Sequence, residues 1–175
     1  MTVGITFGCF IPLHKGHLSM ISTSRANNDL TIIAVCGHDN DRGKGYIPFE
    51  DRYRLIRQIY QDDPRTLIVK IDDNALGLDG TFTLENWELW CAELFEQAGF
   101  DPTTLNDTFT WYSGEPDYVQ KLKVLYPTLE FCLLDRGQIG ISGTMIRKNT
   151  EEYLNVIHPA FRTYLARNKV IRKKG

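Results

Sequence analysis

Residues 8–17, GCFIPLHKGH, are the stretch that most restricts how this chain can fold. They end a β-rich run from Val3 to Phe10, bend at glycine and proline, and precede apolar residues with helical spacing. At a junction of strand, turn and helix, the first N–H groups of the helix lack partners inside it, and the helix dipole adds partial positive charge. The sequence therefore predicts an anion-binding turn at the start of the first helix.

Short β-branched or aromatic runs alternate along the chain with segments of helical periodicity. The predicted strands are residues 3–10, 30–36, 67–71, 109–112 and 129–134, and the predicted helices are residues 18–26, 51–60, 84–98 and 118–125. This alternation predicts an α/β fold: a Rossmann-like, doubly wound parallel sheet of about five strands with a helical C-terminal region. Ligands of such sheets bind at the carboxyl ends of the strands, so the loops that follow strands are the candidate site.

Composition favours one domain over residues 1–175, because 175 residues with 42% hydrophobic content can bury a single core. The formal charge of -2 gives no reason to expect nucleic acid, and the basic tail, residues 166–175, is interpreted as a solvated terminus. No basic leader and no apolar run of membrane-spanning length is found, which predicts a cytoplasmic protein without a membrane partner. The cysteines are predicted to be reduced thiols, since Cys9, Cys36, Cys91 and Cys132 show no CxxC spacing.

The first loop offers two imidazoles, His14 and His17, that could donate hydrogen bonds to phosphate oxygens. Either histidine alone could instead be a turn or helix-cap residue, but their combination with Gly8 and Gly16 favours phosphate binding. We assign Gly8, Phe10 and Gly16 to the same phosphate-binding loop. The spacing does not fit HExxH zinc chemistry, so no metal ligand from protein side chains is expected.

A second segment with the same character is ISGTMIR, residues 141–147. Ser142 and Thr144 supply hydroxyl groups at another predicted helix start, and Arg147 follows about one turn later. A plain serine cap with a surface arginine is the alternative. Two anion-seeking helix starts in one chain favour a polyphosphate ligand.

The pair of motifs, GCFIPLHKGH and ISGTMIR, resembles the signature of the adenylyl- and cytidylyltransferase superfamily. Within it, residues 3–165 are most similar to the nicotinamide mononucleotide adenylyltransferase domain of NadR-type proteins. Bifunctional relatives carry a kinase domain after this one, but the chain has no GxxxxGK[ST] motif, so we expect no kinase domain.

The resemblance implies condensation of ATP with nicotinamide mononucleotide to give NAD and pyrophosphate, by direct attack on the α-phosphate. His14, His17 and Arg147 are the implied catalytic residues, and Ser142 and Thr144 would hold the leaving phosphates. The implied cofactor is Mg²⁺, bound through the phosphates of ATP rather than by protein ligands.

Four further residues are implied to bind the mononucleotide, and Glu115 to border the adenosine. Trp87 or Trp90 would stack on the pyridinium ring, although core packing is the alternative for both. Arg52 would lie near phosphate or be salt-bridged, Asp39 would line the entrance or belong to a polar loop, and Glu115 could instead be part of an ordinary turn.

Other readings of the sequence remain open at this stage. The nearest alternative is another superfamily transferase that uses nicotinate mononucleotide, pantetheine phosphate or a CTP-dependent substrate. A non-catalytic nucleotide-sensing module is the alternative of a different class. Whether the chain forms a homo-oligomer is not readable from the sequence.

Overall fold

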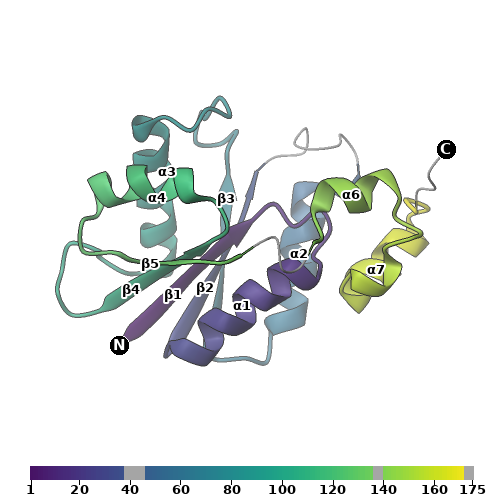
Figure 1. Cartoon of the computed structure of the whole chain (residues 1–175), viewed down its shortest axis with the longest axis horizontal. Coiled ribbons are helices and arrows are strands. Elements are labelled where there is room, and N and C mark those ends of the chain that lie inside the picture. Colours follow the sequence, from purple (N-terminus) through teal and green to yellow (C-terminus); the bar gives the residue numbers. More distant parts are fainter. Residues whose placement is uncertain (38–45, 136–139, 172–175) are drawn as a thin grey trace.

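A computed structural model describes residues 1–37, 46–135 and 140–171 of the chain. Its centre is a parallel five-stranded sheet with the strand order β3-β2-β1-β4-β5 (Figure 1). The strands are β1 (Thr2–Gly8), β2 (Leu30–Gly37), β3 (Thr66–Asp72), β4 (Thr108–Ser113) and β5 (Glu130–Leu133). The predicted α/β class and all five predicted strands are confirmed.

Helices connect the strands and complete the C-terminal region. They are α1 (Lys15–Asn27), α2 (Phe49–Tyr60), α3 (Leu84–Ala98), α4 (Pro116–Leu125), α6 (Gly143–Lys148) and α7 (Pro159–Arg167), with a 3-10 turn, η1 (Leu154–Val156). Helix α3 has the predicted bounds because Thr83 caps its start and Gly99, at φ 74°, ends it. The other predicted helices begin two or three residues earlier than the apolar spacing indicated.

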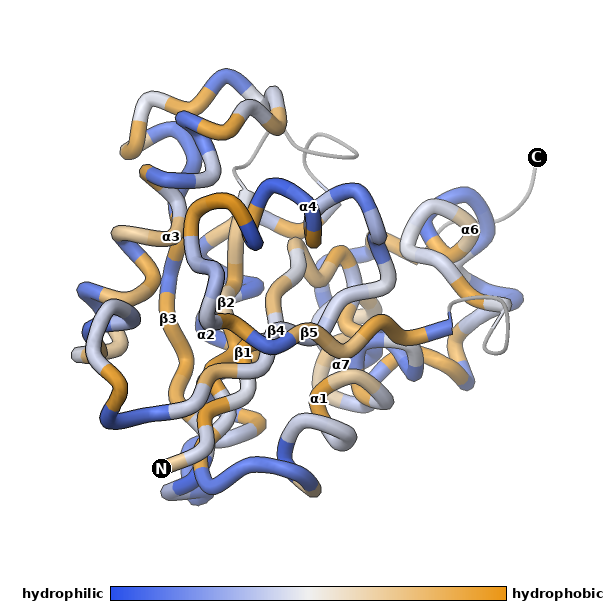
Figure 2. The backbone as a smooth tube through the Cα atoms, turned by 60° about the vertical axis from the view of Figure 1, so that its left-hand side comes forward, coloured by the Kyte–Doolittle hydropathy of each residue, from blue (hydrophilic) through white to orange (hydrophobic). Residues whose placement is uncertain are grey.

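The helices cover both faces of the sheet, as the alternating pattern predicts. Helices α3 and α4 lie over one face, and α1, α2 and α7 lie over the other (Figure 1). Each face has its own apolar cluster, one built around Trp111 and Leu94 and the other around Ile33 and Phe161. The central strands β1 and β2 are buried from both sides, which explains the nearly continuous apolar sequence of β2; in β1, apolar residues alternate with threonine and glycine (Figure 2).

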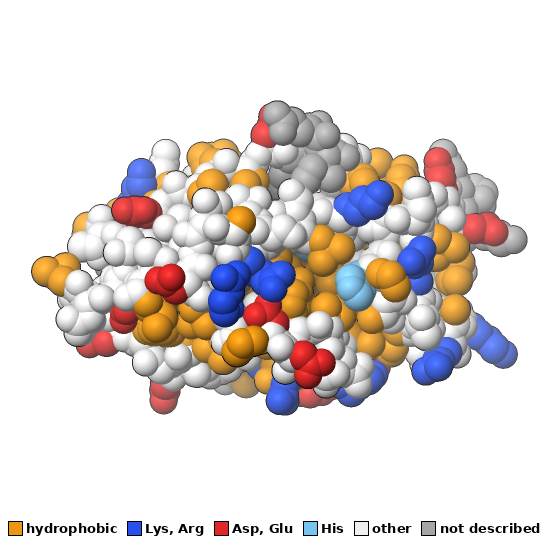
Figure 3. All heavy atoms as spheres, turned by 90° about the horizontal axis from the view of Figure 1, so that it is seen from below, with side chains coloured by type: hydrophobic (Ala, Val, Ile, Leu, Met, Phe, Trp, Pro, Cys, Tyr) orange, Lys and Arg blue, Asp and Glu red, His pale blue; other side chains and the backbone are white. Residues whose placement is uncertain are grey.

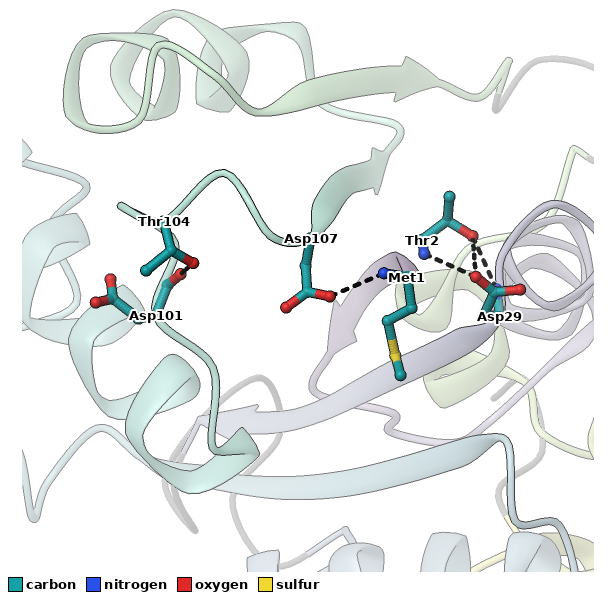
Figure 4. A network of polar contacts seen from close by, with 6 residues as sticks. All are labelled: Met1, Thr2, Asp29, Asp101, Thr104 and Asp107. Carbon is teal, nitrogen blue, oxygen red and sulfur yellow. Dashed lines mark hydrogen bonds and ion pairs between the residues drawn. The ribbon is translucent and has the colours of Figure 1, made fainter.

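Polar contacts fasten the amino ends of the strands. The Thr2 backbone N–H donates to Asp29 at 2.8 Å, the Thr2 hydroxyl lies 3.1 Å from the same carboxylate oxygen, and the Met1 amine lies 2.9 Å from Asp107 (Figure 4). The two hydrogen bonds from Thr2 lower the pKa of the Asp29 carboxyl. The contacts of Met1 and Thr2 fix one end of the sheet, opposite the ends from which the functional loops leave.

The face seen from below in Figure 1 carries Lys and Arg side chains next to Asp and Glu side chains (Figure 3).

Within residues 1–37, 46–135 and 140–171, no helix is long and apolar enough to cross a membrane. Residues 172–175 of the basic tail lie outside the described part of the chain.

Candidate phosphate-binding site

Strand β1 lies at the centre of the sheet: β2 and β3 are added on one side of it, and β4 and β5 are added on the other. Strand β1 ends at Gly8 and β4 ends at Ser113, so loops leave to opposite sides at this point. In open α/β sheets, ligands bind at the carboxyl ends of the strands at such a switch point. The GCFIPLHKGH segment runs from the end of β1 into α1 and therefore lies at the switch point.

His14 and His17 form a reciprocal cap at the start of α1. The Nδ1 atom of His14 accepts from the Gly16 N–H at 3.0 Å, and Nδ1 of His17 accepts from the His14 N–H at 3.3 Å. Because Nδ1 is the acceptor in each ring, the N–H of each neutral imidazole is on Nε2. The capping and phosphate-donor alternatives weighed from the sequence are therefore compatible, since they use different nitrogens.

The two rings are packed together and backed by Phe10. The His14 and His17 centroids are 3.9 Å apart with planes tilted by 32°, and the Phe10 ring meets His17 edge-on at 4.8 Å. Phe10 is 1% exposed and has φ 56°, a conformation that costs a non-glycine residue about 1 kcal/mol or more. A Cβ on Gly8 would lie 3.1 Å from the Phe10 ring, so Gly8 leaves space for it. Phe10 thus orients the His17 ring, and direct phosphate contacts of Gly8 and Phe10 stay predictions.

The second motif starts α6 and reaches back to the first. Ser142 caps α6 by accepting from the Met145 N–H at 3.2 Å. Arg147 donates from Nη1 to the Ile11 carbonyl at 2.8 Å and from Nη2 to the Thr144 hydroxyl at 3.2 Å. Segments 136 residues apart in the chain are therefore joined at one place.

Two glycines allow this close approach. A Cβ on Gly143 would lie 2.8 Å from Nη1 of Arg147 and 3.3 Å from the Ile11 carbonyl oxygen. A Cβ on Gly16 would lie 2.8 Å from the His14 ring and 3.9 Å from the Ile141 carbonyl oxygen. Gly143 therefore leaves room for the first loop beside α6, whereas Gly16 leaves room for the His14 ring within that loop.

The C-terminal region supports the loop, which sequence reasoning did not anticipate. His14 forms an antiparallel bridge with Ile157, and the His158 N–H donates to the Leu13 carbonyl at 3.0 Å. His158 also caps α7 by accepting from the Ala160 N–H at 3.1 Å, while burial and then the nearby Arg162 lower the pKa of its imidazole. Pro159 at the first turn of α7 was the available signal for a helix start, but nothing in the sequence located its partner loop.

Arg52 lies at the carboxyl ends of the strands, but it is buried. Its side chain is 0% exposed, and Nη1 donates to the carbonyls of Cys9 at 2.7 Å and Cys36 at 3.1 Å. The neighbouring Arg54 is half exposed and pairs with Asp51. Arg52 therefore holds the ends of β1 and β2 together, and its predicted contact with substrate phosphate stays a prediction.

Trp87 and Trp90 belong to an aromatic cluster beside the end of β1. Both are buried, at 5% and 6% exposed, and the Phe7 ring meets them at 6.2 and 5.7 Å. Phe82, which is half exposed, stacks on Trp87 at 6.0 Å. The core-packing alternative describes both tryptophans here, and stacking on a ligand stays a prediction. The buried Nε1 of Trp87 has no hydrogen-bond acceptor among the described residues.

Glu115 and Asp39 are the two remaining residues that the sequence predicts at the site. Glu115 is half-buried, follows the carboxyl end of β4, and donates its N–H to the Ser113 hydroxyl at 3.0 Å. It therefore lies on the β4 side of the switch point. Asp39 lies outside the described residues. Among the residues that the structure describes, no three His, Cys, Asp or Glu side chains form a metal-binding group.

Comparisons with known proteins agree with this architecture. NadR from Salmonella typhimurium, a trifunctional NAD biosynthesis and regulator protein, is 27% identical over 97% of this chain and 42% of its own length. The chain thus spans about two-fifths of that relative. A protein from Thermus thermophilus named "Probable nicotinate-nucleotide adenylyltransferase" is 30% identical over 87% of this chain and 88% of its own length.

Solved structures of NadR proteins share the fold. A NadR complex with NR has a TM-score of 0.78 and 31% identity, covering 94% of this chain and 45% of the other. A NadR complex with NAD and AMP-PNP has a TM-score of 0.75 and 32% identity, covering 94% of this chain and 46% of the other. The predicted resemblance is confirmed. Residues 5–149 match the family model described as cytidylyltransferase-like, and the chain belongs to the cytidylyltransferase-like family of nucleotidyltransferases.

Proposed function

We propose that this chain is an adenylyltransferase of NAD biosynthesis, which joins ATP to nicotinamide mononucleotide and releases pyrophosphate. The observation that carries the proposal is the junction of the two motifs, where Arg147 links α6 to Ile11 of the first loop. Two helix starts meet there with N–H groups, hydroxyls, imidazoles and a guanidinium, a donor set suited to a triphosphate.

The reaction needs alignment and charge stabilisation rather than a protein nucleophile. The phosphate monoester of the mononucleotide is already ionised near neutral pH, so its oxygen can attack the α-phosphorus of ATP directly. We assign the Nε2–H groups of His14 and His17 to the phosphates at the reacting centre. Ser142, Thr144 and Arg147 would hold the β- and γ-phosphates that leave as pyrophosphate.

Mg²⁺ would enter bound to ATP and neutralise the developing charge on the leaving phosphates. The N–H group of His14 and the guanidinium of Arg147 would bind phosphate oxygens that are not bound to Mg²⁺. Gly8 and Gly16 would let the backbone approach the same oxygens.

The nicotinamide form of the substrate is the first choice, and the nicotinate form is the specific alternative. The NadR complex with NAD and AMP-PNP supports the nicotinamide form, because NAD contains nicotinamide, while the Thermus relative, which this chain covers over most of its length, is named for nicotinate nucleotide. Trp87 and Trp90 are the candidates to face the pyridine ring, with Phe82 over Trp87 at the exposed side.

A substrate panel tests the proposal. The purified chain is incubated with ATP and Mg²⁺ plus nicotinamide mononucleotide, nicotinate mononucleotide or pantetheine phosphate, and pyrophosphate and the condensed product are measured for each. We expect pyrophosphate and NAD with nicotinamide mononucleotide at the highest kcat/KM. Preference for nicotinate mononucleotide would reassign the substrate, whereas ATP binding without pyrophosphate release on any acceptor would favour the nucleotide sensor.

A further inference from the structure

Two of the four cysteines meet at the carboxyl ends of neighbouring strands. The parallel register ends with Gly8 of β1 opposite Val35 of β2, and Cys9 and Cys36 are the residues that directly follow this last pair. Cys36 belongs to the apolar cluster on the α3 and α4 face, and Cys9 packs against that cluster and against the cluster on the other face. A hydrogen bond joins the two thiols, so the sulfur atoms lie next to each other.

Arg52 fixes the spacing of the two main chains at this point. A single nitrogen, Nη1, donates to both the Cys9 carbonyl at 2.7 Å and the Cys36 carbonyl at 3.1 Å. Neighbouring strands lie about 4.8 Å apart, and cysteines in a disulfide have Cα atoms about 4.4–6.8 Å apart. The spacing of neighbouring strands lies within this range, and formation of the disulfide needs only a local shift at Cys9, which follows the last residue of β1.

The two thiols differ in their access to solvent. Cys9 is half-buried, whereas Cys36 is 9% exposed. A hydrogen bond with Cys9, followed by burial, raises the pKa of the Cys36 thiol, so Cys36 keeps its proton and donates it to the Cys9 sulfur. Because Cys9 is the more accessible thiol, it reacts with a reagent first, and Cys36 reacts second.

We propose that Cys9 and Cys36 are a modification site, which closes to a reversible disulfide by exchange with a small organic disulfide such as oxidised glutathione. The Cys9 thiolate attacks one sulfur of the reagent, forms a mixed disulfide and releases one small thiolate. Cys36 then loses its proton to solvent and attacks the Cys9 sulfur, and the second small thiolate leaves. Two protein thiols are oxidised, one small disulfide is reduced to two thiols, and the two protons complete those thiols.

The disulfide would act on the phosphate-binding loop. Cys9 lies between Gly8 and Phe10, and Phe10 packs against the His17 ring at 4.8 Å. Pulling the Cys9 sulfur to about 2.05 Å from the Cys36 sulfur shifts this part of the loop, so turnover should fall as the bond forms. This consequence rests on the proposed function, but formation of the bond does not.

The test uses the full chain in glutathione buffers of increasing oxidised fraction, quenched with acid and alkylated. Trypsin cleavage after Lys15, Arg25 and Arg42 places Cys9 in residues 1–15 and Cys36 in residues 26–42. We expect the cross-linked pair of these peptides, two fewer alkylated thiols, and full reversal by dithiothreitol. Retention of both alkylated thiols in fully oxidised glutathione, or a glutathione adduct on Cys9 beside an alkylatable Cys36, would overturn the assignment.

Three variants separate the steps. Cys36→Ser should stop at the mixed disulfide on Cys9, and Cys9→Ser should leave Cys36 alkylatable. Cys132→Ser is the matched control, because Cys132 is half-buried on β5, with β4 between it and β1, and this variant should cross-link as the parent does. Cross-linking in a chain that transfers no adenylyl group would refute the proposed function alone, whereas cross-linking at constant turnover would overturn the effect on the loop.

Discussion

His17 shows how one side chain can serve both fold and chemistry. Its Nδ1 atom accepts from the His14 N–H, while its Nε2–H is the proposed phosphate donor. His17→Asn places an amide oxygen near the position of Nδ1 and removes the donor, so stability should be kept and turnover should fall about 100- to 1000-fold. His17→Gln reaches the Nε2 position without the cap and should retain more activity. Pyrophosphate release and thermal unfolding, measured on both variants, check this split.

The outcome that contradicts it is equally specific. If His17→Asn unfolds at the parent temperature and keeps parent turnover, Nε2 has no role in transfer. If both variants unfold at a lower temperature than the parent, the cap is the main contribution of His17. Only the activity that remains in His17→Gln then reports on the chemistry.

Gly143 tests the junction of the two motifs. A methyl group at this position would lie 2.8 Å from Nη1 of Arg147 and displace the guanidinium from the Ile11 carbonyl. The displaced guanidinium would lose its proposed charge-assisted hydrogen bond to a phosphate of ATP, about 1.5 kcal/mol or more, and this should raise the KM for ATP about tenfold in Gly143→Ala. Alanine favours a helix by up to about 1 kcal/mol over glycine, so a loss of stability would not explain that result.

Met145→Ala is the matched control for Gly143→Ala, since Met145 is exposed on the same helix. It should leave the KM for ATP unchanged. An unchanged KM in Gly143→Ala would mean that the Arg147 contact does not shape the ATP site.

At the scale of elements, Arg52 and Arg54 lie two residues apart on α2 but have different surroundings. Arg52→Met would leave the Cys9 and Cys36 carbonyls without this donor and should lower the free energy of unfolding by about 2–4 kcal/mol. Arg54→Ala removes only an exposed pair with Asp51 and should change it by less than about 0.5 kcal/mol. Urea unfolding of the two variants is the measurement, and equal effects would contradict the role given to Arg52.

The strands were predictable from sequence because each is a short apolar run that ends at turn residues. Helix starts were less predictable, since they depend on caps rather than on apolar spacing. Helix α1 begins at Lys15 instead of Leu18 because His14, an unusual cap residue, accepts from the Gly16 N–H. Helix α3 began as predicted because Thr83 is a residue type that commonly caps helices.

At the scale of the whole molecule, the sequence predicted that two distant motifs share one ligand but not how they meet. Contact between Arg147 and Ile11 depends on the strand order and on the path of the chain after β5, which local periodicity does not encode. The support of Leu13 and His14 by Ile157 and His158 depends on the same path. Burial of Arg52 was missed because an arginine beside acidic residues on an amphipathic helix usually faces solvent.

The stability of the whole molecule should depend on pH on the alkaline side. Burial raises the pKa of the Cys91 thiol and of the Tyr126 and Tyr164 hydroxyls to about 12, from ordinary values of about 9 and 10. The unfolded chain therefore releases these protons at lower pH than the folded chain does. Stability is fully present below pH of about 9, and falls as pH rises towards about 12.

A variant of Tyr164 distinguishes the effect of its titration on stability from the effect of losing its hydrogen bond. Its hydroxyl donates to Asp51 at 2.6 Å and so joins α7 to α2. Tyr164→Phe should lose about 1 kcal/mol at pH 8, where the hydroxyl is protonated in both states, and should then lose stability less steeply above pH of about 10. Urea unfolding at a series of pH values measures both effects. Parallel curves for the parent and Tyr164→Phe up to pH of about 12 would show that Tyr164 does not contribute to the alkaline loss, because removing a titrating group must change the slope wherever that group titrates.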